Sequence, residues 1–290
     1  MNLIHTSFHL ILGAALMSNV SYASDWLKEH HWSQAIQAQA KPEEITWLTT
    51  NNQKVLALYT EKTTQTYSQG IILLHDIDNH PDWPQVLHPL RTQLPQHGWS
   101  TLSLQMPIVT NQNQSNFDSL LLQAEPRITA AINFLKNKQI KQIILLGHGI
   151  GATLAAAYIE KHITQRPEII ALIGIGFYTN SQTSSWLNIT KTLPNIPISI
   201  LDIFGQNDLP WVLTSANERL QSARQSGKLG NPVFSDRTTK VQQLALNKTG
   251  NMRFRQIKIL GANHGFLNQT ATLIKHIRGW LTKHIIRQSQ

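Results

Sequence analysis

The chain has no cysteine among its 290 residues. This absence excludes disulfide bonds, a thiol nucleophile and a lipid-modified N-terminal cysteine, so the packed core has to supply the stability of the fold. Long hydrophobic runs are missing too: apart from a short one near the N-terminus, none approaches the roughly 20 residues that a membrane helix needs. We therefore expect no stable membrane insertion of the mature chain.

Residues 1–23 lack Lys, Arg, Asp and Glu. They hold an apolar stretch from Leu10 to Met17 and end in Ser21-Tyr22-Ala23, a small-x-small pattern that is typical of signal-peptide cleavage sites. The sequence thus predicts a signal peptide over residues 1–23, cleavage near Ala23-Ser24, and a periplasmic or secreted mature chain. The weak positive charge of the N-terminal region leaves an uncleaved anchor as the alternative.

Charged residues are scarce, at 14%, and acidic ones are the minority: 25 Lys and Arg face 16 Asp and Glu, for a net charge of +9. Such an excess favours anionic ligands, and an anionic envelope surface is a further candidate partner, although ordinary soluble proteins reach similar charge. Nucleic-acid binding is not expected, because export and the lack of a recognised module outweigh the charge. From Arg219 to Lys258 nine Lys or Arg face Asp236 alone, which favours a solvated helical face.

The hydrophobic content of 41% can fill a sizeable core, and no internal repeat or linker divides the chain. We predict a single domain over residues 24–290. Six short, β-branched-rich runs bounded by turn residues indicate buried parallel strands. They cover residues 70–75, 100–107, 142–148, 169–177, 197–205 and 255–261.

Two further runs, "EEITWLTT" and "KVLALYTEK", flank Asn51-Asn52 and predict an antiparallel hairpin ahead of these strands. Segments with helical spacing alternate with the strands, so helices should cover both faces of the sheet. One helix is expected to start at Pro126, because proline suits a first helical turn, with the polar run 110–119 as a surface loop. The predicted fold class is α/β, with a mostly parallel sheet of about eight strands.

The stretch "LLGHGIGA" (145–152) has the form of a nucleophile elbow, in which a strand enters a glycine-flanked turn and leaves as a helix. Its central position holds Gly149, which has no side chain to attack with. Two later residues keep the chain order of the acid and the histidine in such enzymes: Asp208 in "FGQNDLPW" and His264 in "GANHGF". Each follows a predicted strand at its carboxyl end, where open α/β sheets place their sites.

With these motifs the sequence resembles the α/β-hydrolase superfamily, and more closely a family of exported bacterial proteins of that fold whose function is not established. The closer resemblance rests on residues 72–107 together with "LLGHGIGA" and "GANHGF". It implies an oxyanion hole built from the amide of Ile150 and an amide near Asp76 or Ile77. The usual hydrolase reads His-Gly where this chain reads His75-Asp76, and a carboxylate pointing inward there would oppose a developing oxyanion.

The missing nucleophile leaves several readings of function. The favoured one is a non-catalytic protein that binds a small or acyl-bearing ligand, in which Gly149 merely relaxes a strained turn. The alternative is an esterase-like hydrolase of ester or amide bonds that uses the Asp208–His264 pair with water or another hydroxyl. Tyr178, Thr179 and Ser181 are the candidate hydroxyls for it.

A metal that activates water would also replace the serine. One loop after a predicted strand crowds imidazoles and carboxylates that suit Zn²⁺ or Mn²⁺, namely His75, Asp76, Asp78, His80 and Asp82. Their spacing matches no established motif, and Asp82 can cap the next helix instead. We therefore expect no metal and no other cofactor. His148, beside the elbow, is expected to pack against the turn rather than act as a base.

Overall fold

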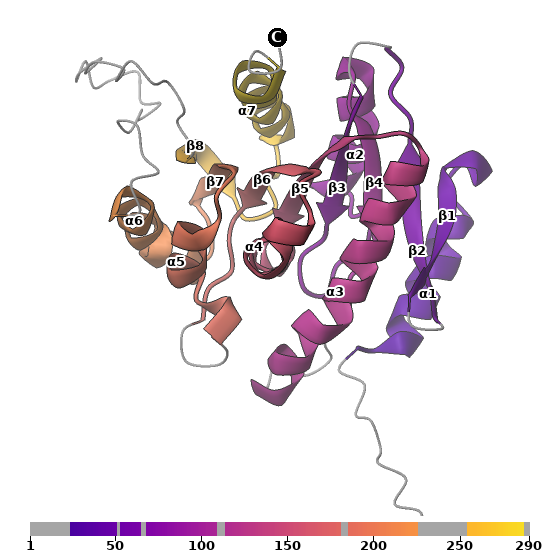
Figure 1. The fold of residues 1–290 in the computed structure, drawn as a ribbon, viewed down its shortest axis with the longest axis horizontal. Coiled ribbons are helices and arrows are strands. Elements are labelled where there is room, and N and C mark those ends of the chain that lie inside the picture. Colours follow the sequence, from indigo (N-terminus) through magenta and orange to yellow (C-terminus); the bar gives the residue numbers. More distant parts are fainter. Residues whose placement is uncertain are drawn as a thin grey trace, which may run out of the picture.

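The computed structural model describes residues 24–50, 53–64, 68–108, 114–180, 185–225 and 254–286. The predicted signal peptide and the Asn51-Asn52 turn lie outside these ranges. Within them, the chain forms one eight-stranded sheet with helices on both sides (Figure 1). None of the helices in these ranges is long and apolar enough to span a membrane.

The sheet has the strand order β1-β2-β4-β3-β5-β6-β7-β8. An antiparallel hairpin begins it, and β2 also pairs antiparallel with β4; the later strands are parallel, as predicted. The bounds are β1 Ile45–Thr50, β2 Gln53–Thr60, β3 Gln69–Leu74, β4 Ser100–Leu104, β5 Gln142–His148, β6 Ile169–Ile175, β7 Ser199–Asn207 and β8 Phe254–Asn263.

Two apolar cores lie on the two faces of the sheet. On β3 the side chains alternate, with Ile72 and Leu74 in one core and Ile71 and Leu73 in the other. A strand that is covered on both faces reads as a continuous apolar run, which explains the pattern seen in the sequence. The first core packs on α3 (Gln114–Asn137), α4 (Ile150–His162) and α6 (Pro210–Gln225); the second packs on α2 (Leu87–Gln93) and α7 (Thr270–Leu281).

Two shorter parts complete the fold. Helix α1 (Trp26–Gln37) covers the hairpin, where Ile36 packs on Leu56 and Leu58. Helix α5 (Ile189–Thr192) is a single turn before β7. The hairpin end of the sheet therefore has a helix of its own, separate from the layers that cover the parallel strands.

Helix α3 corrects one prediction from the sequence. It begins at Gln114, so Pro126 lies inside the helix rather than at its start, and residues 114–119 are helical rather than a loop. A proline within a helix removes one hydrogen bond and costs about 3 kcal/mol. Phe117, Leu120 and Ala124 are buried on the same side as the later turns, and this burial offsets that cost.

Candidate active site

The elbow predicted at residues 145–152 is present. Gly149 joins β5 to α4 with φ 54° and ψ −120°, in the left-handed region that favours glycine. The flanking glycines are required by close packing: a Cβ on Gly147 would lie 2.3 Å from the backbone of Ala152. A Cβ on Gly151 would lie 2.4 Å from the carbonyl oxygen of His75. The turn therefore has the tight geometry of a nucleophile elbow without the nucleophile.

Asp76, which follows β3, fills the space that Gly149 leaves. Its Oδ1 accepts hydrogen bonds from the amides of Ile150 (2.7 Å) and Ile77 (2.8 Å). The resemblance implied an oxyanion hole from the Ile150 amide and an amide near Asp76 or Ile77, and the amides of Ile150 and Ile77 both point at one oxygen of this carboxylate. A Cβ on Gly149 would lie 1.9 Å from the same oxygen. The side chain of Asp76 thus points inward, toward Gly149 and His264.

His264, which follows β8, lies between two carboxylates. Its Nδ1 is 2.6 Å from Oδ1 of Asp208 and its Nε2 is 2.9 Å from Oδ2 of Asp76. Asp208 follows β7 and is held by the amides of Gly205 (2.9 Å) and Leu209 (2.8 Å). Because an ionised carboxylate can only accept hydrogen bonds, both ring nitrogens donate, and the ring is an imidazolium.

The charges of Asp76, Asp208 and His264 stabilise one another. Burial on its own would lower the pKa of His264, but the hydrogen bonds to Asp208 and Asp76, and their negative charges, raise it to about 9. Burial opposes ionisation of Asp76, yet the hydrogen bond with His264, the nearby imidazoles and the Ile150 amide hold its pKa below the ordinary value. The pKa of Asp208 is lowered in the same way, against its burial, by His264. At neutral pH the site holds two carboxylates and one imidazolium.

His148 packs beside the turn, as expected. It is 1% exposed, and its ring stacks on that of His264 with the centroids 4.5 Å apart. Burial, followed by the positive charge of His264, lowers the pKa of His148 to about 4, so the ring is neutral. Its Nε2 donates to the backbone carbonyl of His264 at 2.9 Å. This hydrogen bond joins the elbow to the loop that carries His264.

The five loop residues considered as metal ligands do not converge. His75 is buried and bonded through both ring nitrogens. Asp78 pairs with Lys28 at 3.1 Å, and the ring of His80 lies against Trp32 and Trp83. Asp82 binds Arg91 and His88, rather than capping the following helix as expected. Within the described ranges a different set, Asp76, His148 and His264, has ligand atoms within 4.8 Å of one another.

The structure also describes two of the three hydroxyls that were candidates for a substitute nucleophile. Thr179 Oγ1 donates to the carbonyl of Leu187 at 3.1 Å, and the ring of Tyr178 stacks on Phe117. Ser181 lies outside the described residues. Since Asp208 and Asp76 hold both nitrogens of His264, the imidazole has no nitrogen left to activate a hydroxyl.

One residue of this region was not found from the sequence. Gln105 follows β4, and its Nε2 donates to His75 Nε2 at 3.0 Å, while His75 Nδ1 donates to the carbonyl of Asp76 at 2.8 Å. Burial is the main reason that the pKa of His75 falls to about 3, which keeps the ring neutral and able to accept. The position of Gln105 at the carboxyl end of a parallel strand was the only hint in the sequence.

Solved structures with this fold are numerous and distant in sequence. Est1E from Butyrivibrio proteoclasticus superposes with a TM-score of 0.59 at 12% identity, covering 84% of this chain and 99% of that one. A dienelactone hydrolase from Anabaena variabilis gives 0.57 at 15% identity, covering 83% and 96%. An alpha-beta serine hydrolase homologue from Coxiella burnetii gives 0.57 at 13%, covering 83% and 99%. At these identities the likeness shows the fold alone.

No curated protein matches the chain in sequence. A family model described as "Protein of unknown function (DUF3530)" matches residues 27–120 and 112–230, which is well over half of the chain. The sheet, the elbow and the order of Asp208 and His264 are those of an α/β-hydrolase fold. The chain has this fold and belongs to the DUF3530 family.

Proposed function

We propose that this protein is a non-catalytic member of the α/β-hydrolase fold that binds a small or acyl-bearing ligand. The observation that carries the proposal is the position of Asp76, whose carboxylate occupies the oxyanion hole and the space of the nucleophile side chain. We also propose that the chain is exported through residues 1–23, which sequencing of the mature N-terminus would test.

Three features of the site oppose acyl transfer by a serine-type mechanism. Position 149 offers no attacking atom. The amides of Ile150 and Ile77 already bind a negative oxygen, so they are not free to stabilise the oxyanion of a tetrahedral intermediate. His264 carries a proton up to about pH 9, and an imidazolium cannot accept one as a general base. Each feature alone would impair catalysis, and all three involve Asp76 or Gly149.

The test is a pair of substitutions made separately and together in the chain from Ser24 onward. Gly149→Ser alone should hydrolyse esters no faster than the buffer, because Asp76 still competes for His264 and for the amides of Ile150 and Ile77. Asp76→Gly together with Gly149→Ser should free the oxyanion hole and hydrolyse p-nitrophenyl acetate about 10²-fold faster than the single variant, the lower end of what a general base contributes. Adding His264→Gln to the pair is the matched control and should remove the gain.

The wild-type chain should show no turnover of the same ester above the buffer rate. Wild-type turnover that is lost in His264→Gln would refute the proposal. It would support the alternative, a hydrolase in which His264 works with water, a hydroxyl or the Asp76 carboxylate itself. Failure of the double variant to exceed Gly149→Ser, with its fold intact by circular dichroism, would also count against a preserved oxyanion hole.

A further inference from the structure

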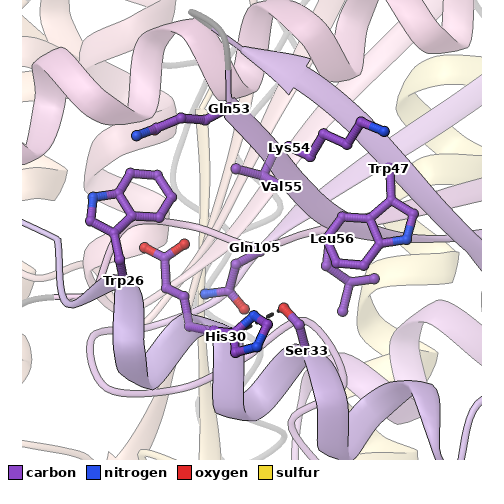
Figure 2. A pocket seen from close by; sticks show the side chains of 10 residues that line it. Trp26, His30, Ser33, Trp47, Gln53, Lys54, Val55, Leu56 and Gln105 are labelled. Carbon is purple, nitrogen blue, oxygen red and sulfur yellow. Dashed lines mark hydrogen bonds between the residues drawn. The ribbon is translucent and has the colours of Figure 1, made fainter.

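A cavity lies near the carboxyl end of β4, the strand beside β3, which Asp76 follows. It is a pocket of about 370 Å³ between α1 and the β1–β2 hairpin, next to the end of β4. Figure 2 shows Trp26 and Trp47 on opposite sides of it, with Gln105 between them. Sites for small organic molecules have volumes of this order. Because the Asp76 side chain fills the space beside Gly149 and His264, a ligand of the proposed binding function has to bind elsewhere. This pocket offers such a site.

Gln105 gives the pocket a hydrogen-bond acceptor without a partner. Its Nε2 donates to His75 Nε2 and to the carbonyl of Met106 at 2.8 Å, so the orientation of the amide is fixed. Its Oε1 is buried and has no hydrogen-bond partner within the described part of the chain. Buried acceptors are nearly always satisfied in folded proteins. A donor on a bound molecule would complete the hydrogen bonding of this residue.

The walls of the pocket favour a flat ring. Trp47, on the edge strand β1, leaves 43% of its surface exposed, so its indole can contact a ring in the cavity. Trp26 closes the opposite side, and Val55 and Leu56 add apolar surface. Two indoles on opposite sides of a cavity suit a fused aromatic ring better than a flexible chain.

The charges around the pocket favour an anion. The carboxylate of Glu29 is neutralised by Arg127, whose guanidinium donates to it at 2.9 and 3.1 Å. Lys54 is exposed among the lining residues, and it adds a positive charge at the rim. A ligand carboxylate near Lys54 would gain from this unlike charge.

We infer that the pocket binds a hydroxylated aromatic carboxylate, with its ring between Trp26 and Trp47, its hydroxyl donating to Gln105 Oε1 and its carboxylate near Lys54. The inference rests on the proposed function in one respect only: that function is the reason for the protein to bind such a ligand. Binding here can be measured whether or not the Asp76 centre is catalytic, since the probes below contain no bond for a hydrolase to cut.

The test uses three related probes and calorimetry with the chain from Ser24 onward. The first is a naphthoate that carries a hydroxyl at the end opposite its carboxylate; the parent naphthoate lacks the donor, and naphthol lacks the charge. Loss of the hydroxyl should weaken binding about tenfold, because Gln105 Oε1 then stays unpaired. The change is made in the probe because Gln105 also holds His75.

Substitutions then locate the site. Trp47→Ala should weaken the hydroxynaphthoate at least about tenfold, and Lys54→Ala should weaken it several-fold. The controls are Trp211→Ala, which removes an exposed indole from α6, and Lys275→Ala on α7; both should leave affinity unchanged. Equal binding of the probes with and without the hydroxyl, an unchanged affinity in Trp47→Ala, or no saturable binding of any probe would overturn the inference. Ester turnover by the wild-type chain would instead count against the proposed function alone.

Discussion

At the scale of single residues, His264 sets how stability depends on pH. Its pKa is about 9 in the folded chain against 6.5 for an unperturbed imidazole. A raised pKa means that the stabilisation is complete below the unfolded value and is lost as the pH rises through about 9. The difference corresponds to roughly 3 kcal/mol of unfolding free energy.

We therefore expect the wild-type chain to lose roughly 3 kcal/mol more than His264→Gln between about pH 6 and about pH 9.5. Urea unfolding of the two chains at both pH values measures this. The comparison between them cancels other groups that titrate in the same range, such as lysines. Parallel pH profiles for the two chains would show that the imidazolium does not stabilise the fold.

The same residues show what a sequence can and cannot reveal. Asp208 and His264 were found because their order along the chain and their places after strands are constraints that one sequence carries. The direction of the Asp76 side chain was not found, because it depends on the space left at Gly149, a residue far from Asp76 along the chain. Gln105 was missed since a single glutamine after a strand has no distinguishing pattern.

At the scale of elements, the contact between α4 and β3 depends on Gly151. A Cβ there would lie 2.4–2.5 Å from the carbonyl oxygens of His75 and Leu74, so the helix would have to move off the strand. We expect Gly151→Ala to destabilise the chain by about 1–3 kcal/mol, as overpacking does. Chemical denaturation gives the value.

Gly279 is the matched control, because it also lies within a helix, α7, and a Cβ there would meet nothing within 4 Å. Gly279→Ala should stabilise the chain by about 0.5–1 kcal/mol, since alanine loses less backbone entropy than glycine in a helix. If both alanine variants shifted stability in the same direction, close packing at Gly151 would not be the cause.

Secondary-structure elements were predicted well where burial gives a simple pattern of apolar residues. They were predicted poorly where a local preference and tertiary packing disagree. Inner parallel strands such as β3 and β5 are apolar on both faces, and the six predicted strands were placed to within a few residues. Helix α3 was started too late, because the local preference of Pro126 for a first turn was weighed without the buried face that continues through Phe117 and Leu120. Tertiary packing overrode the local rule there.

At the scale of the whole molecule, a buried ion pair holds each end of the sheet. At the hairpin end Glu29 of α1 pairs with Arg127 of α3. At the other end Arg219 of α6 pairs with Asp202 of β7 at 2.8 Å, and both side chains are fully buried. The basic stretch that begins at Arg219 had suggested a solvated face, and for Arg219 this was wrong. The sequence did not show that Arg219 would pair with a carboxylate of β7, that of Asp202.

Arg219→Met should destabilise the chain by about 3–5 kcal/mol, because it leaves the buried charge of Asp202 without its positive partner, bonded only to the neutral Gln256 amide at 2.8 Å. Asp202→Leu combined with Arg219→Met should recover most of that loss, since buried pairs are often replaceable by apolar residues of similar size. Urea unfolding of the three chains measures both effects. A double variant no more stable than Arg219→Met would mean that the ion pair contributes more to stability than the mutual neutralisation of two buried charges.

The collision distance of 1.9 Å at the elbow also restricts how this gene could regain a nucleophile. A codon change that placed serine at position 149 first would push the Asp76 carboxylate away from the elbow and break its hydrogen bonds with Ile150, Ile77 and His264. A lineage that had already replaced the acidic residue at position 76 would accept that serine without this loss. The route with the smaller loss of stability therefore changes position 76 first, and its intermediate carries glycine or another small residue at both places.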